Sequence, residues 1–399
     1  MSNVWLHIVG IGEDGIDGLL PATRAIVEAA EVIIGGERHH ALLPNLKAER
    51  LAWPSPFDAM IKTILAQKGH RAVVLVTGDP LWYSAGAKFA QAIPTAEIMF
   101  HPQLSAFQWA AARLGWSLAD CETLTVHGRP SEQIVTAFAP CVRLLILTKD
   151  ATSPASVAKL LVERGYGQSQ MIVLAALGGP HELRFDGVAE SWVHDVPDFH
   201  TLAVECLAGP DAQILPRTGL PDGCFINDGK LTKQAVRAVT LAKLAPHRGA
   251  ILWDVGAGSG AIGIEWMRAA PEALAYGLEP RANRRAVAAQ NALALGAPRL
   301  QLIDGQAPAA FAGLPTPNAV FFGGGISIEA IEAAMHALAP LGRLVANAVT
   351  LESEAVLLAA FAKHKGSLQR ISVETADPVG PFYGWRPSMP VTQWHWVKP

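Results

Sequence analysis

Residues 250–260 read AILWDVGAGSG, an apolar run that ends in an acidic residue and continues into three alternating glycines. The run predicts a buried strand, and the glycines predict a tight turn where bare backbone can approach a ligand closely. We expect a helix to begin at Ala261 and to point its free backbone N–H groups toward the same place. The segment therefore predicts a cradle for a cofactor.

Two cofactors fit this cradle, and a glycine-rich turn without a ligand is the third reading. The dinucleotide pattern G-x-G-x-x-G/A begins at Gly256, so an NAD site stays open. S-adenosylmethionine is favoured by Asp254, which could meet a positively charged amino-acid portion, and by the additional glycine at Gly260. The next predicted strand ends in Glu279, which suits ribose hydroxyls in either cofactor. The spacing favours S-adenosylmethionine and leaves NAD open.

The composition is that of a globular protein with more than one domain. The chain has 399 residues, of which 50% are apolar and 17% charged, so it can bury large cores and is not expected to be disordered. The net charge of −3 gives no overall basic field for nucleic acid. We therefore expect a small-molecule partner and no nucleic acid.

Targeting and metal-binding signals are missing from the sequence. The N-terminal residues show no basic region followed by a long apolar stretch, and the longest apolar runs, such as 171–177, are too short to span a bilayer. The four cysteines form no C-x-x-C pair, which predicts a reduced, cytoplasmic protein. None of the 13 histidines has metal-ligand spacing, and we interpret His39-His40 as a polar helix end. We expect no membrane partner and no metal.

Strand-like apolar runs alternate with helical stretches along the chain, which predicts α/β architecture. Residues 206–217 are rich in Pro, Gly and Asp and predict a linker. The predicted domains are therefore 1–205 and 218–399.

The second half reads as one doubly wound unit. Thr232 could cap a helix that runs to about Leu244. The pattern further predicts strands at 250–255, 275–279, 300–304, 318–322, 343–348, 368–375 and 391–397, and helices at 261–270, 281–294, 328–338 and 352–364. Five parallel strands followed by an antiparallel pair make a Rossmann-like, mostly parallel seven-stranded sheet. Ligands collect at the carboxyl ends of such strands, which here are Asp254–Gly260, Glu279, Asp304–Pro308, Gly323–Gly325 and Asn347–Thr350.

The first half places glycine or short polar residues after several predicted strands. A strand at 6–9 runs into Gly10–Gly15, and a helix follows from Pro21 to Ala30. A second strand, 72–76, ends in Thr77-Gly78-Asp79-Pro80. Further along, we expect a helix at 107–114 and a buried strand at 144–147.

These segments together resemble known families. The first half resembles the tetrapyrrole (corrin and porphyrin) methylases, through residues 9–15, 30–36, 77–80, 105–107, 127–130 and 177–180. The second half resembles the partner methyltransferases that also decarboxylate, through residues 219–223, 228–233, 236–238, 254–260, 264–266 and 321–325. The resemblance covers nearly the whole chain.

The resemblance implies an N-terminal tetrapyrrole methylase domain of two α/β subdomains and a C-terminal Rossmann-like class I methyltransferase domain. It implies two methyl transfers from S-adenosylmethionine to a precorrin tetrapyrrole in cobalamin biosynthesis. The first half would methylate C5, and the second half would methylate C15 and remove CO2 from the C12 acetate. It also implies a homo-oligomer, either a dimer or a tetramer.

The resemblance further implies two sets of cofactor contacts. In the second half they are Thr232, Gly256, Ala257, Gly258, Ser259, Gly260, Glu279 and Ala307. In the first half they are Gly10, Gly12, Gly78, Asp79, Pro80, Ser84, Ala85 and Gly86. One departure concerns Gln306, which stands where the related proteins often have an aspartate. It leaves open whether Asp304 or Gln306 faces the adenine.

The chemistry asks little of side chains, since positioning supplies most of the rate. We expect no nucleophile–base triad and assign no catalytic residue. The acetates and propionates of the substrate call for cationic partners, and the candidates are Lys233, Arg237, His127 and Arg129. We expect the remaining conspicuous residues to be solvated (Arg281, Arg284, Arg285), to pack the helix after the glycine turn (Glu265, Trp266), or to serve sheet packing or an interface (Trp385, Trp394, Trp396).

Overall fold

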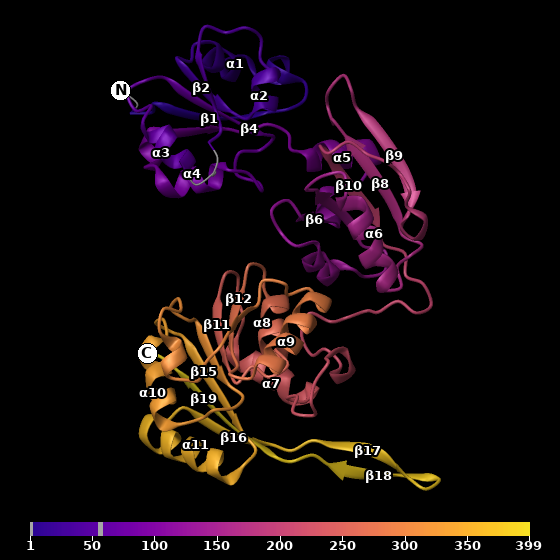
Figure 1. Ribbon diagram of the computed structural model, residues 1–399, viewed down its shortest axis with the longest axis vertical. Coiled ribbons are helices and arrows are strands. Elements are labelled where there is room, and N and C mark those ends of the chain that lie inside the picture. Colours follow the sequence, from indigo (N-terminus) through magenta and orange to yellow (C-terminus); the bar gives the residue numbers. More distant parts are fainter. Residues whose placement is uncertain (1–2, 55–58) are drawn as a thin grey trace. The chain divides into compact units, whose positions relative to one another are not determined.

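The computed structural model describes residues 3–54 and 59–399. Met1 and Ser2, which belong to the N-terminal segment analysed for a signal peptide, lie outside the described residues. The chain forms two compact units (Figure 1). Unit 1 comprises Met1–Ser131 and Ala137–Gln213, and unit 2 comprises Glu132–Thr136 and Ile214–Pro399. Within the described ranges, no helix is long and apolar enough to cross a membrane.

Unit 2 is built on the seven-stranded, mostly parallel sheet that the sequence predicts. Its strand order is β13 (Gln301–Ile303), β12 (Leu274–Leu278), β11 (Ile251–Val255), β14 (Ala319–Phe322), β15 (Arg343–Ala348), β19 (Val391–Val397) and β16 (Ser367–Ile371). Strands β11 to β15 pair in parallel, and β19 runs antiparallel to both of its neighbours. Strands β12 and β13 lie on one side of β11, and β14 and β15 lie on the other. The carboxyl ends of β11 and β14 are therefore the switch point, where ligands bind in such sheets.

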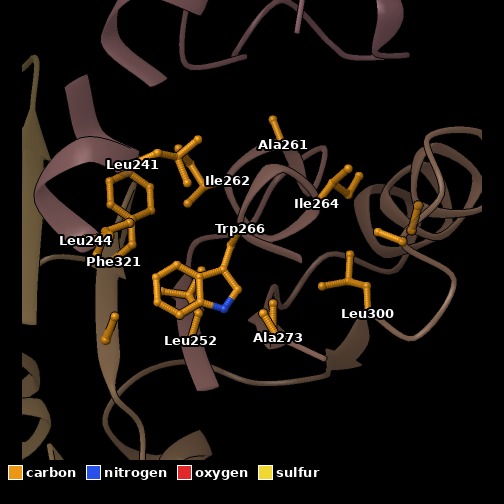
Figure 2. Packing of buried hydrophobic residues seen from close by; sticks show 14 of the residues in the cluster. Leu241, Leu244, Leu252, Ala261, Ile262, Ile264, Trp266, Ala273, Leu300 and Phe321 are labelled. Carbon is orange, nitrogen blue, oxygen red and sulfur yellow. The ribbon is translucent and has the colours of Figure 1, made fainter. Parts of the chain in front are cut away.

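Helices cover both faces of this sheet. One face packs against α7 (Gln234–Leu244), α8 (Ala261–Ala269) and α9 (Ala282–Ala294). The other packs against α10 (Ile328–Ala337) and α11 (Leu351–His364). Trp266 of α8 is fully buried among aliphatic side chains of the first face, and its indole N–H donates to the carbonyl of Ala250 (Figure 2). The expected packing role of Trp266 is confirmed.

Two local expectations for unit 2 are wrong. Helix α7 begins at Gln234 with Lys233 as its N-cap residue, and no side chain caps it; Thr232 lies one position too early to accept from the first-turn amides. The strand expected at 368–375 ends at Ile371, because the chain then leaves the sheet as a separate hairpin of β17 (Glu374–Val379) and β18 (Phe382–Pro387).

The β17–β18 hairpin extends away from the helices of its own unit (Figure 1). Phe382, Tyr383 and Trp385 are each at least 73% exposed on it. A two-stranded hairpin is only marginally stable alone in water, and large apolar side chains gathered on a surface mark interaction sites. Of the tryptophans near the C-terminus, Trp394 is instead buried in the sheet, where it donates to the carbonyl of Lys365.

Unit 1 contains two sheets, as expected for two α/β subdomains. The first is fully parallel, in the order β3 (Glu49–Ala52), β2 (Val32–Gly35), β4 (Ala72–Thr77), β1 (Leu6–Ile11) and β5 (Ile98–His101). The second is mixed, in the order β6 (Cys121–Thr125), β7 (Arg143–Leu147), β10 (His200–Glu205), β8 (Gln170–Ala175) and β9 (Leu183–Val188).

The helices of unit 1 follow from the local sequence. Helix α1 (Pro21–Glu28) starts with proline in its first turn, where no N–H is needed. Helix α5 (Ala106–Leu114) is capped by Ser105, whose hydroxyl accepts from the amide of Phe107. The remaining helices are α2 (Glu37–Ala41), α3 (Met60–Leu65), α4 (Gly86–Ala92) and α6 (Ser153–Glu163).

Candidate functional site

The glycine turn of unit 2 follows β11 at the switch point of the sheet. Gly256, Gly258 and Gly260 have φ values of 74°, 57° and 79°, a region that side chains disfavour. A Cβ on Gly256 would lie 2.8 Å from the amide nitrogen of Gly324, because the turn after β14 passes against it. A Cβ on Gly258 would meet nothing closer than 3.8 Å, so this part of the turn faces open space. The structure thus supplies a bare-backbone cradle.

Glu279 closes one side of this cradle. It directly follows β12 and is 3% exposed. Its Oε2 accepts from the amide of Gly258 at 3.1 Å, and its Oε1 accepts from the amide of Arg281 at 3.0 Å. Ala257 is also buried, and its amide donates to the carbonyl of Leu278. The fold therefore brings Glu279 into contact with the glycine turn, although the two lie about twenty residues apart in the sequence.

Asp254 does not face the cradle. It is 1% exposed, and its Oδ2 accepts from the amide of Gly263 in the first turn of α8 at 3.0 Å. Burial raises the pKa of Asp254, the hydrogen bond from Gly263 lowers it, and the nearby charge of Glu279 raises it, so that the pKa is about 7. The expectation that Asp254 meets a charged amino-acid portion is wrong in this structure, since its carboxyl is buried against the first turn of α8.

Three arginines follow Glu279; Arg281 is exposed as expected, whereas Arg284 and Arg285 are not simply solvated. Arg284 pairs with Asp228 at 2.5 Å, and Arg285 pairs with Asp304 through two hydrogen bonds of 2.8 and 2.9 Å. Asp304 therefore already has a cationic partner. The neighbouring Gln306 is exposed and Ala307 is half-buried.

Arg237 is the clearest correction among the substrate-contact candidates. It is fully buried, pairs with Glu265 at 2.8 Å and Asp222 at 2.6 Å, and also donates to the carbonyls of Leu220 and Thr232. Glu265 is equally buried and also accepts from the amides of Gly219 and Leu220. Arg237 thus holds the 219–222 segment in place and is not available to a substrate carboxylate.

Lys233 has the opposite environment. Its side chain is 58% exposed and lies 3.8 Å from Asp222. Thr232 beside it is half-buried at the entrance to α7.

Asn291 of α9 is a residue that sequence reasoning missed. It is 1% exposed and donates to the carbonyl of Ser259 in the glycine turn at 2.9 Å. No motif contains it, and its position on the helix that follows Glu279 is the only signal that could have pointed to it.

Closely packed glycines lie at the carboxyl ends of β1 and β4 in unit 1. Strand β1 continues to Ile11, so Gly10 lies in the strand and not in the turn expected after residue 9. A Cβ on Gly10 would lie 1.9 Å from the carbonyl oxygen of Gly78, and one on Gly78 would lie 2.9 Å from the Cα of Ser105. A Cβ on Gly86 would similarly meet the carbonyl of Pro80 at 2.2 Å. The expected contact segments of the first half therefore stack directly on one another.

The other expected residues of unit 1 take part in the same turns. A Cβ on Gly12 would meet the carboxylate of Asp14 at 2.6 Å, and Asp79 accepts from the amide of Leu81 at 2.7 Å. Ala85 is the N-cap residue of α4, and Ser84 precedes it.

Arg38 joins the two turns of unit 1 and was also missed. Its guanidinium donates to Glu13, after β1, and to the hydroxyl of Thr77, at the end of β4. It also lies 4.0 Å from the ring centre of Phe199, and burial lowers its pKa to about 10. His39 contacts Thr77 at 3.0 Å, in keeping with its reading as a polar helix end.

His127 and Arg129 follow β6, at the edge of the second sheet of unit 1. His127 is exposed and Arg129 is half-buried. Such positions suit contact with a charged ligand.

Comparisons with known proteins match both units. The profile of the tetrapyrrole (corrin/porphyrin) methylases matches residues 5–191, and that of the precorrin methyltransferase domain matches residues 223–398. A precorrin-6Y C(5,15)-methyltransferase [decarboxylating] of Sinorhizobium sp. is 45% identical, over 99% of this chain and 96% of the relative. The protein of the same name from Mycobacterium tuberculosis CDC 1551 is 39% identical, over 98% and 99%. The C-terminal domain of precorrin-6Y C5,15-methyltransferase from Rhodobacter capsulatus is 45% identical, covers 46% of this chain and 100% of that one, and gives a TM-score of 0.44.

Proposed function

The chain belongs to the family of precorrin-6Y C(5,15)-methyltransferases (decarboxylating), and from this premise we propose that it methylates C5 and C15 of precorrin-6B and decarboxylates the C12 acetate to give precorrin-8X. Methyltransferases of this family use S-adenosylmethionine, so the NAD reading of the glycine turn is set aside. The predicted domain 218–399, which lies in unit 2, would carry out C15 methylation and decarboxylation. The predicted domain 1–205, most of which lies in unit 1, would carry out C5 methylation.

The observation that carries the proposal is the open turn at Gly258 beside the carboxylate of Glu279. Bare backbone admits the cofactor closely, and a carboxylate accepts from ribose hydroxyls. Thr232, Ala307 and residues Gly256–Gly260 are the other proposed contacts of this site. These residues fit S-adenosylmethionine, which supplies an electrophilic methyl group when it is bound.

The second site is proposed in unit 1. The proposed contacts are Gly10, near the end of β1, Gly12, which follows β1, and Gly78, Asp79 and Pro80 after β4, together with Ser84-Ala85-Gly86 at the start of α4. Because this site is built on a different sheet from the first, we propose one S-adenosylmethionine site in each unit and no metal.

The protein's main task is positioning. A meso carbon of the partly reduced macrocycle is enamine-like, so no side chain has to generate a nucleophile. In the decarboxylation, the C–C bond to the acetate carboxylate breaks, CO2 leaves, and the electron pair enters the conjugated macrocycle before a proton replaces CO2. Excluding water from the reacting carboxylate favours this step. Lys233, His127 and Arg129 remain the proposed partners of the other carboxylates.

The proposal extends to assembly and location. The exposed aromatic side chains of the β17–β18 hairpin support a homo-oligomer, a dimer or a tetramer. We propose a cytoplasmic location with a precorrin as the partner, and neither membrane nor nucleic acid.

The decisive experiment is mass spectrometry of the products formed from precorrin-6B and S-adenosylmethionine. The proposal requires a gain of two methyl groups and a loss of one CO2. Two methyl groups without loss of CO2 would refute the decarboxylase assignment, and calorimetric binding of NADH without binding of S-adenosylhomocysteine would refute the cofactor assignment.

A further inference from the structure

One face of α9 lines the glycine turn of unit 2. Arg284, Ala288 and Asn291 are spaced i, i+4 and i+7 and therefore lie on the same side of the helix. Arg284 lies 3.9 Å from the carboxylate of Glu279, and the Cβ of Ala288 lies 3.1 Å from where a Cβ on Gly260 would be. Three successive turns of one helix thus contact the cradle.

Asn291 makes the most specific of these contacts. Its side-chain amide donates to the carbonyl of Ser259 at 2.9 Å and to the carbonyl of Ile226 at 2.8 Å, while its oxygen accepts from the amide of Ile226 at 2.9 Å. At 1% exposure, these bonds face little competition from water. One side chain thereby joins the glycine turn to the segment 226–230.

The segment 226–230 has few other attachments along its length. Asp228 is held by Arg284 of the same helix face, and a Cβ on Gly229 would meet nothing within 4 Å. Both of these anchors, Asn291 and Arg284, come from α9. The position of the segment relative to the glycine turn therefore depends on this face of the helix.

We infer that Asn291 is a positioning residue for the methyl-donor site of unit 2, which rests on the proposed function. By holding the carbonyl of Ser259, it orients the turn so that the amide of Gly258 faces Glu279. By holding Ile226, it keeps the 226–230 segment against the same turn. Asn291 acts through these backbone groups and does not itself contact the cofactor.

The test compares Asn291→Ala and the similarly sized Asn291→Leu with Gln290→Ala, an exposed neighbour on the same helix, all in the full chain. Hydrogen exchange read by mass spectrometry reports the two sites separately, through peptides covering 254–262 in unit 2 and 78–86 in unit 1. S-adenosylhomocysteine is the probe. We expect protection of 254–262 in both Asn291 variants to require about tenfold more probe than in the unsubstituted chain, since a buried carbonyl loses its donor.

Further readouts separate positioning from general packing. Protection of 78–86 should stay unchanged, and KM for S-adenosylmethionine in C15 methylation should rise about tenfold while kcat changes less. The Gln290→Ala variant should match the unsubstituted chain in every measurement.

Each alternative outcome has a distinct meaning. Unchanged protection of 254–262 in both Asn291 variants would overturn the inference, and so would loss of the folded unit 2 in both. If the probe protects 78–86 but not 254–262 in the unsubstituted chain, the proposed cofactor site of unit 2 fails instead.

Discussion

The carboxylate of Glu279 accepts a 3.1 Å hydrogen bond from the backbone amide of Gly258. This contact joins the end of β12 to the turn after β11, across two neighbouring parallel strands of the sheet. It places a buried negative charge next to the open part of the turn. We expect the remaining acceptor capacity of that carboxylate to serve the ribose hydroxyls of the cofactor.

Replacing Glu279 should therefore weaken cofactor binding in unit 2 only. We expect Glu279→Ala to weaken S-adenosylhomocysteine binding there by about 1–3 kcal/mol, because charge-assisted hydrogen bonds to the ligand are lost. Calorimetry should resolve one weakened and one unchanged site. Glu272→Ala, an exposed acid in the same unit, is the matched control. Equal affinity in both variants would remove Glu279 from the site.

Glycine replacements should separate the two methyl transfers. A Cβ at position 10 would lie 1.9 Å from the carbonyl oxygen of Gly78, so Gly10→Ala must displace a turn of unit 1. We expect this variant to abolish C5 methylation and to retain C15 methylation and decarboxylation. Gly256→Ala should give the reverse pattern. Product masses from precorrin-6B read out both, and loss of both methyl transfers in either variant would argue against independent sites.

The buried pair of Arg237 and Glu265 should matter for stability. We expect Arg237→Met to destabilise unit 2 by about 3–5 kcal/mol, because Glu265 is then left as an uncompensated buried charge. Urea unfolding measures this loss. Lys233→Met is the matched exposed control and should change stability by no more than about 0.5 kcal/mol.

The Lys233→Met variant also tests the proposed contact between Lys233 and the substrate. If Lys233 binds a carboxylate of the macrocycle, Lys233→Met should raise KM for the precorrin without lowering stability. Unaltered KM in a stably folded Lys233→Met protein would leave that carboxylate to another residue.

Asp254 should make stability depend on pH. Its pKa of about 7 lies above the value of 3.8 for a free side chain, so between these pH values the unfolded chain releases a proton that the folded chain keeps. Asp254 therefore lowers the stability of the wild type as pH rises through this window. Asp254→Asn keeps an acceptor for the amide of Gly263 without titrating. We expect its stability relative to wild type to improve by about 2 kcal/mol from pH 5 to pH 8.

Urea unfolding at both pH values checks this prediction for Asp254. The exposed control Asp195→Asn should give the same difference from wild type at each pH. An unchanged relative stability of Asp254→Asn between pH 5 and pH 8 would show that the carboxyl is already ionised in the folded protein across this range.

The β17–β18 hairpin should control assembly. We expect the double substitution Phe382→Ser and Trp385→Ser to lower the oligomeric state, because it removes most of the exposed aromatic surface of the hairpin. Light scattering after gel filtration measures the mass. Leu351→Ser, at an exposed apolar position on α11, should leave it unaltered. An unchanged mass in the double variant would place the interface elsewhere.

Most of the sheet of unit 2 could be predicted from the sequence, because buried parallel strands read as continuous apolar runs bounded by turns. The hairpin could not. Its strands, ETADPV and FYGWRP, do not alternate apolar and polar residues and contain Pro378, Gly384 and Pro387, so the pattern does not indicate a hairpin there. The glycine turn after β11 could be predicted for a related reason, since glycine spacing is a local signal.

Contacts between distant segments set the limit of prediction at the site. Arg237 and Lys233 lie four residues apart in the same stretch, and their sequence context makes both look like anion-binding residues. In the folded chain, Arg237 is buried in an ion pair with Glu265 of α8, whereas Lys233 stays exposed. Asn291 and Arg38 were missed in the same way, because their partners are backbone groups or side chains far along the chain.

Gly256 and Gly258 occupy the same turn, yet the folded chain crowds only the first of them. The chain's own backbone at Gly324 crowds the first, whereas only solvent faces the second in the structure. In a library of variants selected for folding alone, substitutions at Gly256 should therefore be depleted more strongly than substitutions at Gly258. In the same library selected for methyl transfer, substitutions at both positions should be depleted. Comparing the two selections would separate the part of a glycine motif that serves the fold from the part that serves the ligand.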